Sequence, residues 1–145
     1  MVDLPPGTGD AQLSLVQHVQ VAGGIIVTTP QEVSVGDALR GAKMFEKVGV
    51  PVVGIVENMS GFVCPHCGER TDIFATGGGR RLAEELGVPL LAVVPLHPHV
   101  QLLGESGTPV VIAEPDSPAG QALRGLAERV EREAPRSVPL PTAAG

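Results

Sequence analysis

The sequence contains neither tryptophan nor tyrosine, and only three of its 145 residues are phenylalanine. Because 43% of the residues are nonetheless hydrophobic, the predicted core consists of valine, leucine, isoleucine and alanine. A chain of this length fits one domain and can bury a substantial core. Its 19 glycines and 14 prolines predict many tight connections between short elements.

Charge is also scarce, since 18% of the residues are charged and the net charge is −6. An acidic chain of this kind offers no basic face, which argues against nucleic acid or an anionic membrane as a partner. No apolar run approaches the roughly 20 residues that a membrane-spanning helix needs, and the N-terminus lacks the pattern of an export signal. We therefore expect a cytoplasmic protein, in a compartment where neighbouring cysteines bind a metal or act as a catalytic dithiol.

The two cysteines of the chain lie in one motif, Cys64-Pro65-His66-Cys67-Gly68. Two thiolates are half of the four ligands that a structural zinc ion or a 4Fe–4S cluster takes. The other ligands could come from histidines of the chain or from a second copy of it, or the pair could instead carry out redox chemistry. Local context favours a metal, because the residues after Cys67 do not predict the helix that follows a thioredoxin-type cysteine.

Zinc needs further ligands here, because the sequence contains no second C-x-x-C motif. They would have to be His66, His97, His99 or residues of a partner chain. His97 and His99 flank Pro98 and could chelate a metal if the loop allowed it, although two isolated loop histidines more often have no such role.

Short apolar segments alternate with helical patterns along the chain. We predict buried strands at residues 22–29, 51–56 and 90–94, and a short fourth strand at 110–112. Helices are predicted at residues 11–19, 35–48 and 78–86, with a last one from Ser117-Pro118, which supply a capping hydroxyl and a first-turn proline. The pattern indicates an α/β fold in which helices flank a parallel sheet. The predicted domain covers residues 1–134, and residues 135–145 are predicted to be a disordered tail.

Ligands of parallel sheets bind beyond the carboxyl ends of the strands. Four segments rich in polar and turn-forming residues are predicted at such ends: 3–10, 28–31, 57–68 and 95–98. We expect these segments to form one site, with residues 58–76 as a long loop that carries the cysteines.

Four motifs occur in order: Asp3-Leu4-Pro5-Pro6-Gly7-Thr8-Gly9-Asp10, Thr28-Thr29-Pro30-Gln31, Glu57-Asn58-Met59-Ser60 and the cysteine motif. Through them the sequence closely resembles the Mrp/ApbC family of ATP-binding iron–sulfur cluster carriers, which are relatives of the MinD-like deviant P-loop ATPases. The resemblance covers nearly all of residues 2–134. It implies part of a P-loop NTPase-like parallel sheet flanked by helices, with a C-x-x-C loop.

The resemblance also implies roles for particular residues. Cys64 and Cys67 match the cluster ligands, which in the family join the same pair of a second subunit to hold a 4Fe–4S cluster in a homodimer that serves apo iron–sulfur proteins. Asp3 matches the aspartate at the magnesium end of the ATP site. Gly7, Thr8 and Gly9 match the loop that senses the γ-phosphate. Asn58 matches an asparagine that hydrogen-bonds the adenine edge, a task for which its amide has both donor and acceptor.

The sequence departs from the family pattern at two points. It contains no G-x-x-x-x-G-K-[ST] phosphate-binding loop. We therefore expect it to correspond to the carboxyl-terminal part of the family fold and not to hydrolyse ATP by itself. His97 stands where the family commonly has aspartate, which weakens the case that its loop contacts the base or the ribose.

These patterns predict an iron–sulfur cluster carrier or scaffold, dependent on nucleotide in full-length relatives. The alternative is a non-enzymatic remnant or a zinc-stabilised interaction module. Zinc is also expected as a substitute for the cluster in purified protein.

Overall fold

The computed structural model describes residues 1–4, 14–16, 18–64 and 66–134. Its strands are β1 (Gly24–Thr28), β2 (Val52–Glu57), β3 (Phe62–Val63), β4 (Arg70–Thr71) and β5 (Leu90–Val93). Its helices are α2 (Glu32–Lys47), α3 (Gly78–Leu86), α4 (His99–Glu105), α5 (Val110–Ala113) and α6 (Pro118–Glu133). No helix in these ranges is both long enough and apolar enough to cross a bilayer.

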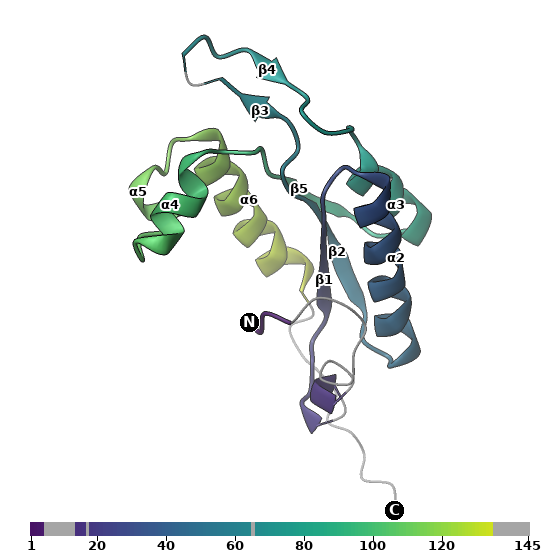
Figure 1. The fold of residues 1–145 in the computed structure, drawn as a ribbon. Coiled ribbons are helices and arrows are strands. Elements are labelled where there is room, and N and C mark those ends of the chain that lie inside the picture. Colours follow the sequence, from purple (N-terminus) through teal and green to yellow (C-terminus); the bar gives the residue numbers. More distant parts are fainter. Residues whose placement is uncertain (5–13, 17, 65, 135–145) are drawn as a thin grey trace, which may run out of the picture.

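The main sheet has the order β1-β2-β5, and both neighbouring pairs are parallel (Figure 1). Thr28 is in register with Glu57, and Glu57 is in register with Val93. The carboxyl ends of the three strands therefore lie at one level. The predicted parallel sheet flanked by helices is confirmed, and it brings the segments that follow β1, β2 and β5 to a common edge.

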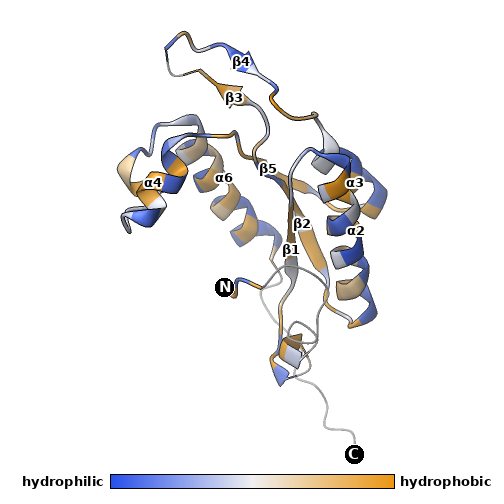
Figure 2. Cartoon of the chain, in the orientation of Figure 1, coloured by the Kyte–Doolittle hydropathy of each residue, from blue (hydrophilic) through white to orange (hydrophobic). Residues whose placement is uncertain are grey.

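Helices cover both faces of this sheet. Helices α2 and α3 pack on one face, around buried Ile55, Phe45 and Leu82. Helix α6 packs on the other, against Val56 and Leu91. Neighbouring residues of β2 serve opposite faces because side chains alternate along a strand. Figure 2 shows hydrophobic strands at the centre and hydrophilic residues on the outer sides of the helices.

The predicted strands at 22–29, 51–56 and 90–94 are observed as β1, β2 and β5. The helices predicted at 35–48, at 78–86 and from Ser117 correspond to α2, α3 and α6. Ser117 caps α6 as predicted, since its hydroxyl accepts a hydrogen bond from the Gly120 N–H at 3.1 Å. Residues 14–16 and 18 of the predicted first helix are helical, whereas the predicted tail lies outside the described residues.

The fourth predicted strand is wrong, because residues 110–113 form the short helix α5. The Ala113 N–H donates to the Pro109 carbonyl at 3.0 Å, and the Glu114 N–H donates to the Val110 carbonyl at 2.9 Å. Proline fits the start of a helix, where no N–H is needed. The β-branched character of three residues is too weak a preference to decide between strand and helix in so short a run.

Three successive glycines let α3 begin close to the ends of β1 and β2. Gly77 has φ 72°, a left-handed conformation that favours glycine. A Cβ on Gly78 would meet the Pro30 backbone, and a Cβ on Gly79 would lie 2.8 Å from the Glu57 Cβ. The triplet therefore allows the first turn of α3 to pack directly against the sheet edge.

We predict that Gly79→Ala lowers the free energy of unfolding by about 1–3 kcal/mol, because the added methyl overlaps Glu57. Gly36→Ala in α2 is the matched control, since a Cβ there meets no atom within 4 Å. In the control, alanine should stabilise the chain by about 0.5–1 kcal/mol through helix propensity. Urea unfolding followed by circular dichroism measures both; a shift of the same sign in the two variants would contradict the packing argument.

Candidate functional site

The cysteines lie in the turn of a small antiparallel hairpin made of β3 and β4, which projects from the sheet (Figure 1). The Cys64 N–H donates to the Glu69 carbonyl, and the Gly68 N–H donates to the Cys64 carbonyl, both at 2.9 Å. Gly68 has φ 73°, which permits this tight reversal. Both thiols are free; Cys64 is half-buried and Cys67 is exposed. The motif therefore presents two sulfurs from a single turn.

The hairpin turn also favours the thiolate form of Cys64. Hydrogen bonds from the backbone N–H groups of Cys67 and His66, and then from the Cys67 thiol, lower the pKa of Cys64. A lower pKa raises the fraction of thiolate near neutral pH, and thiolate is the form that binds metals. Cys67 lies in a turn, and β4 begins three residues later at Arg70. Because no helix begins at this point, the turn lacks the helix that lowers a thioredoxin-type cysteine's pKa, and metal binding fits it better.

The base of the hairpin is tied to the end of β5. The Ser60 N–H donates to the Val94 carbonyl at 2.9 Å, and the Leu96 N–H donates to the Gly61 carbonyl at 2.8 Å. Met59 and Gly61 take φ values of 55° and 74°, so the chain turns sharply between β2 and β3. The structure thus brings the segments after β2 and β5 together, as the sequence predicted.

Glu57 is the buried polar centre of this edge, with only 2% of its surface exposed. One carboxylate oxygen accepts from the Ser60 hydroxyl at 2.6 Å, and the other accepts from the Gly79 N–H at 2.6 Å. The second bond also places negative charge at the N-terminus of α3, where the helix dipole favours it. One feature of the sequence points to this role of Glu57: it is an acidic residue at the carboxyl end of a buried strand.

Asn58 follows β2 directly and is half-buried. Its N–H donates to the Thr28 carbonyl at 2.7 Å, which extends the β1–β2 pairing by one residue. Its side-chain oxygen accepts from the Met59 N–H at 2.9 Å. The side chain therefore lies at the sheet edge predicted to bind ligands, and its adenine-binding role stays a prediction.

Asp3 is exposed and lies in a segment without regular secondary structure. Figure 1 draws the N-terminus beside the amino-terminal end of β1, whereas the cysteine hairpin leaves the opposite end of the sheet. The described structure does not bring Asp3 to the cysteines. Gly7, Thr8 and Gly9 lie outside the described residues, so the proposed phosphate and magnesium contacts of these four residues remain predictions.

A second group of metal-binding side chains consists of His97, His99 and Glu114. His99 Nδ1 lies 2.7 Å from one Glu114 carboxylate oxygen, and His97 Nε2 lies 3.6 Å from the other. Sequence reasoning identified the two histidines but gave Glu114 no ligand role. No spacing rule connects Glu114 to His99, because the chain forms α4 and α5 between them.

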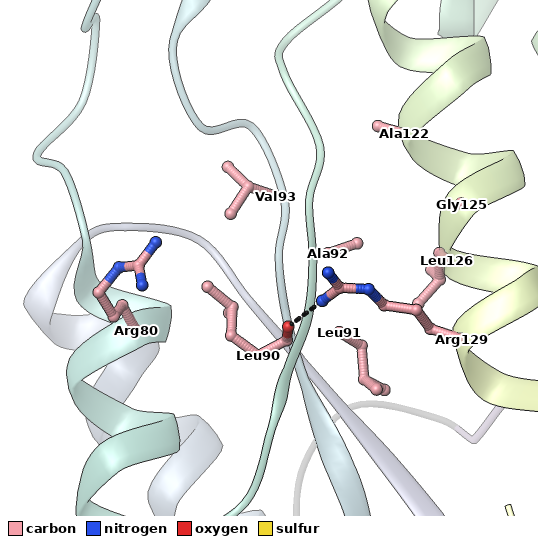
Figure 3. A pocket seen from close by; sticks show the side chains of 9 residues that line it. All are labelled: Arg80, Leu90, Leu91, Ala92, Val93, Ala122, Gly125, Leu126 and Arg129. Carbon is pink, nitrogen blue, oxygen red and sulfur yellow. Dashed lines mark hydrogen bonds between the residues drawn. The ribbon is translucent and has the colours of Figure 1, made fainter. Parts of the chain in front are cut away.

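A pocket of about 410 Å³ lies along β5 (Figure 3), and none of its lining residues belongs to the cysteine hairpin. Arg80 and Arg129 flank it, and strand residues 90–93 form its floor. Arg129 Nη1 donates to the Leu90 carbonyl at 2.9 Å. The pocket contains no nucleophile, acid or base, so we do not assign the chemistry of the chain to it.

The parallel sheet flanked by helices has the architecture of P-loop NTPase-like α/β domains, and a hairpin with two free thiols extends from its edge. The family model described as ParA, NUBPL iron-transfer P-loop NTPase, matches residues 1–131. The chain belongs to this family, which confirms the class of protein predicted from the sequence.

Curated relatives support the same assignment. The iron-sulfur cluster carrier protein of Synechocystis sp. is 51% identical over 131 residues, which are 90% of this chain and 37% of the relative. The iron-sulfur cluster transfer protein NUBPL of Mus musculus is 46% identical over 132 residues, 91% of this chain and 41% of the relative. The chain therefore spans about two fifths of the length of the curated relatives it matches.

Solved structures support the fold. A nucleotide-binding protein from Archaeoglobus fulgidus in complex with ADP is 39% identical, with a TM-score of 0.64 over 72% of this chain and 43% of that protein. The cell division ATPase MinD of Pyrococcus furiosus is 27% identical, with a TM-score of 0.59 over 76% of this chain and 42% of MinD.

We predict that alkylation of Cys64 reaches half its maximal rate at a lower pH than alkylation of cysteine in an unfolded peptide. Cys67→Ala should raise that midpoint, because it removes one of the hydrogen bonds that stabilise the thiolate. The midpoint should stay below the peptide value, since the backbone donors remain. Mass spectrometry of Cys64 after timed iodoacetamide treatment measures it; equal midpoints for folded chain and peptide would contradict the assignment.

Proposed function

We propose that this chain carries the cluster-binding part of an iron–sulfur cluster carrier. Cys64 and Cys67 would bind a 4Fe–4S cluster together with the same two residues of a second copy, in a homodimer. The observation that carries the proposal is the hairpin turn, which presents two free thiols and lowers the pKa of one of them. The relatives' names, iron-sulfur cluster carrier and transfer protein, support the same cargo.

Sulfur stoichiometry supports a shared cluster. A 4Fe–4S cluster usually takes four cysteine thiolates, and each chain provides two. A second copy related by a twofold axis near the hairpin turn would supply the other two thiolates. Such an isologous contact is the kind most common in homo-oligomers. The turn lies at the end of a projecting hairpin, so two copies can approach there without displacing the sheet or its helices.

Transfer to an apo iron–sulfur protein would proceed by ligand exchange. Each acceptor thiol that binds an iron gives up its proton, and the carrier thiolate that leaves can take up a proton, so no electrons change hands. Cys67 is exposed and is the easier ligand to displace first. Cys64 is half-buried, so an incoming thiol would reach it second.

Nucleotide would control this exchange in a longer chain that includes a phosphate-binding loop. Asn58 would hydrogen-bond the adenine, Asp3 would lie on the magnesium side, and Gly7, Thr8 and Gly9 would respond to the γ-phosphate. The structure supports a link to the cargo, because Asn58 follows β2 and precedes the cysteine hairpin by only a few residues. The ADP complex of the Archaeoglobus relative supports nucleotide binding in this fold. We expect no ATP hydrolysis by the 145 residues alone.

Anaerobic reconstitution with iron and sulfide tests the proposal. We expect about four iron and four sulfide ions per two chains, with a dimer by gel filtration under the same conditions. Cys64→Ser and Cys67→Ser should each lose the cluster but keep the circular dichroism of the parent. A full cluster in either variant, or a cluster held by a monomer, would overturn the assignment.

His66→Ala is the matched control, because His66 lies in the same turn and is exposed. It should retain the cluster, since the proposed ligands are all thiolates. Loss of metal in His66→Ala, with one zinc and no sulfide per chain in the parent, would instead identify a zinc-stabilised module.

A further inference from the structure

We propose that His97, His99 and Glu114 form a mononuclear site for a divalent transition metal such as Zn²⁺ or Fe²⁺, separate from the cysteines. One donor atom from each residue lies within 4.8 Å of the others. Glu114 is central, since one of its oxygens faces His99 at 2.7 Å and the other faces His97 at 3.6 Å. The two imidazole rings meet edge to face with centroids 5.5 Å apart.

The environment of His97 is the first reason to expect a cation. Its side chain is only 19% exposed, and none of the described residues forms a hydrogen bond with either of its ring nitrogens. Its Nε2 lies 3.6 Å from the carboxylate, which is too far for a hydrogen bond. The hydrogen bond between His99 and Glu114 leaves the Nε2 of His97 without a partner, whereas a metal ion beside the Glu114 carboxylate would bind this nitrogen.

The donor set selects the class of metal. Two imidazoles and one carboxylate occur in zinc sites and in mononuclear iron(II) sites, whereas Ca²⁺ and Mg²⁺ prefer oxygen ligands alone. Two donors that are each about 2.1 Å from one zinc ion lie at most about 4.2 Å apart. Small side-chain rotations would therefore close the cluster around the ion.

Backbone contacts hold Glu114 in place. It ends α5, and its carbonyl accepts from the Ser117 N–H at 3.1 Å and from the Ser117 hydroxyl at 2.7 Å. A Cβ on Gly120 would overlap this carbonyl, so the first turn of α6 also packs against it. On the other side, Pro95 and Pro98 restrict the backbone around His97. The ligand-bearing segments are thus positioned before any metal binds.

The site also has room for a fourth ligand. A pocket of about 160 Å³ adjoins both histidines and is lined by Val63, Leu96 and Pro118 among others. Three protein ligands with an open position are typical of metal sites that exchange water or small ligands. Val63 precedes Cys64, and Phe62 bridges to Leu96, so the proposed site lies at the base of the hairpin that carries the cysteines.

Cobalt(II) titration of the Cys64→Ser/Cys67→Ser chain tests the site without interference from the thiols. We expect one Co²⁺ per chain, with visible d–d bands and no sulfur-to-cobalt charge-transfer band, and displacement of Co²⁺ by Zn²⁺. In this background, His97→Ala, His99→Ala and Glu114→Gln should each weaken binding at least about tenfold.

His18→Ala in the same background is the matched control, because His18 is exposed and, among the described residues, its ring hydrogen-bonds only to the Ser14 carbonyl. It should bind Co²⁺ as tightly as the parent. Glu114→Gln keeps the size of the side chain, so its Co²⁺ affinity still tests the site if a histidine variant fails to fold. The proposal is overturned if the thiol-free chain binds no Co²⁺, or if Glu114→Gln binds it as tightly as His18→Ala.

Discussion

The buried carboxylate of Glu57 joins the three parts of the chain that support the cysteine hairpin. It ends β2, it accepts from the hydroxyl of Ser60 at the hairpin base, and it accepts from the Gly79 N–H at the start of α3. A buried charge is tolerated only when hydrogen bonds replace its water, and here each oxygen has one short bond. The close approach of Gly79 is what makes the second bond possible, so the glycine triplet and the acid depend on one another.

Elements defined by local patterns were predictable. Helix α3 has the bounds expected from its pattern, because left-handed Gly77 and Gly87 lie immediately before and after it. Strands β1, β2 and β5 follow from short apolar runs between breakers. Residues 110–113 were not predictable in this way, since β-branched residues suggested a strand where Pro109 and the packing of α5 against α6 give a helix. The hydrogen bond between Glu57 and Gly79 spans 22 residues, and no local pattern in the sequence predicts it.

In the candidate site, too, features that arise between neighbouring residues were predictable, whereas contacts between distant residues were not. Proximity of Cys64 and Cys67 follows from a spacing of three residues, and the hydrogen bonds that favour the thiolate arise within the same turn. The approach of Glu114 to two histidines depends on how α4 and α5 pack against one another after β5. The two groups also differ in chemistry: thiolates suit iron–sulfur cargo, whereas imidazole and carboxylate suit a single divalent ion. Soft thiol donors thus lie in the turn of the hairpin, and harder imidazole and carboxylate donors of other segments lie near its base.

The contact between Arg129 and the Leu90 carbonyl affects how this sheet can grow. Strand β5 is the last strand of the described sheet on that side, and a guanidinium of α6 occupies one of its backbone acceptors (Figure 3). Unpaired acceptors of this kind are where another chain's backbone can add to a sheet. Any incoming strand would first have to displace a charged side chain and leave it without its partner. The arrangement therefore disfavours edge-to-edge pairing with a strand of another chain at this edge of the sheet.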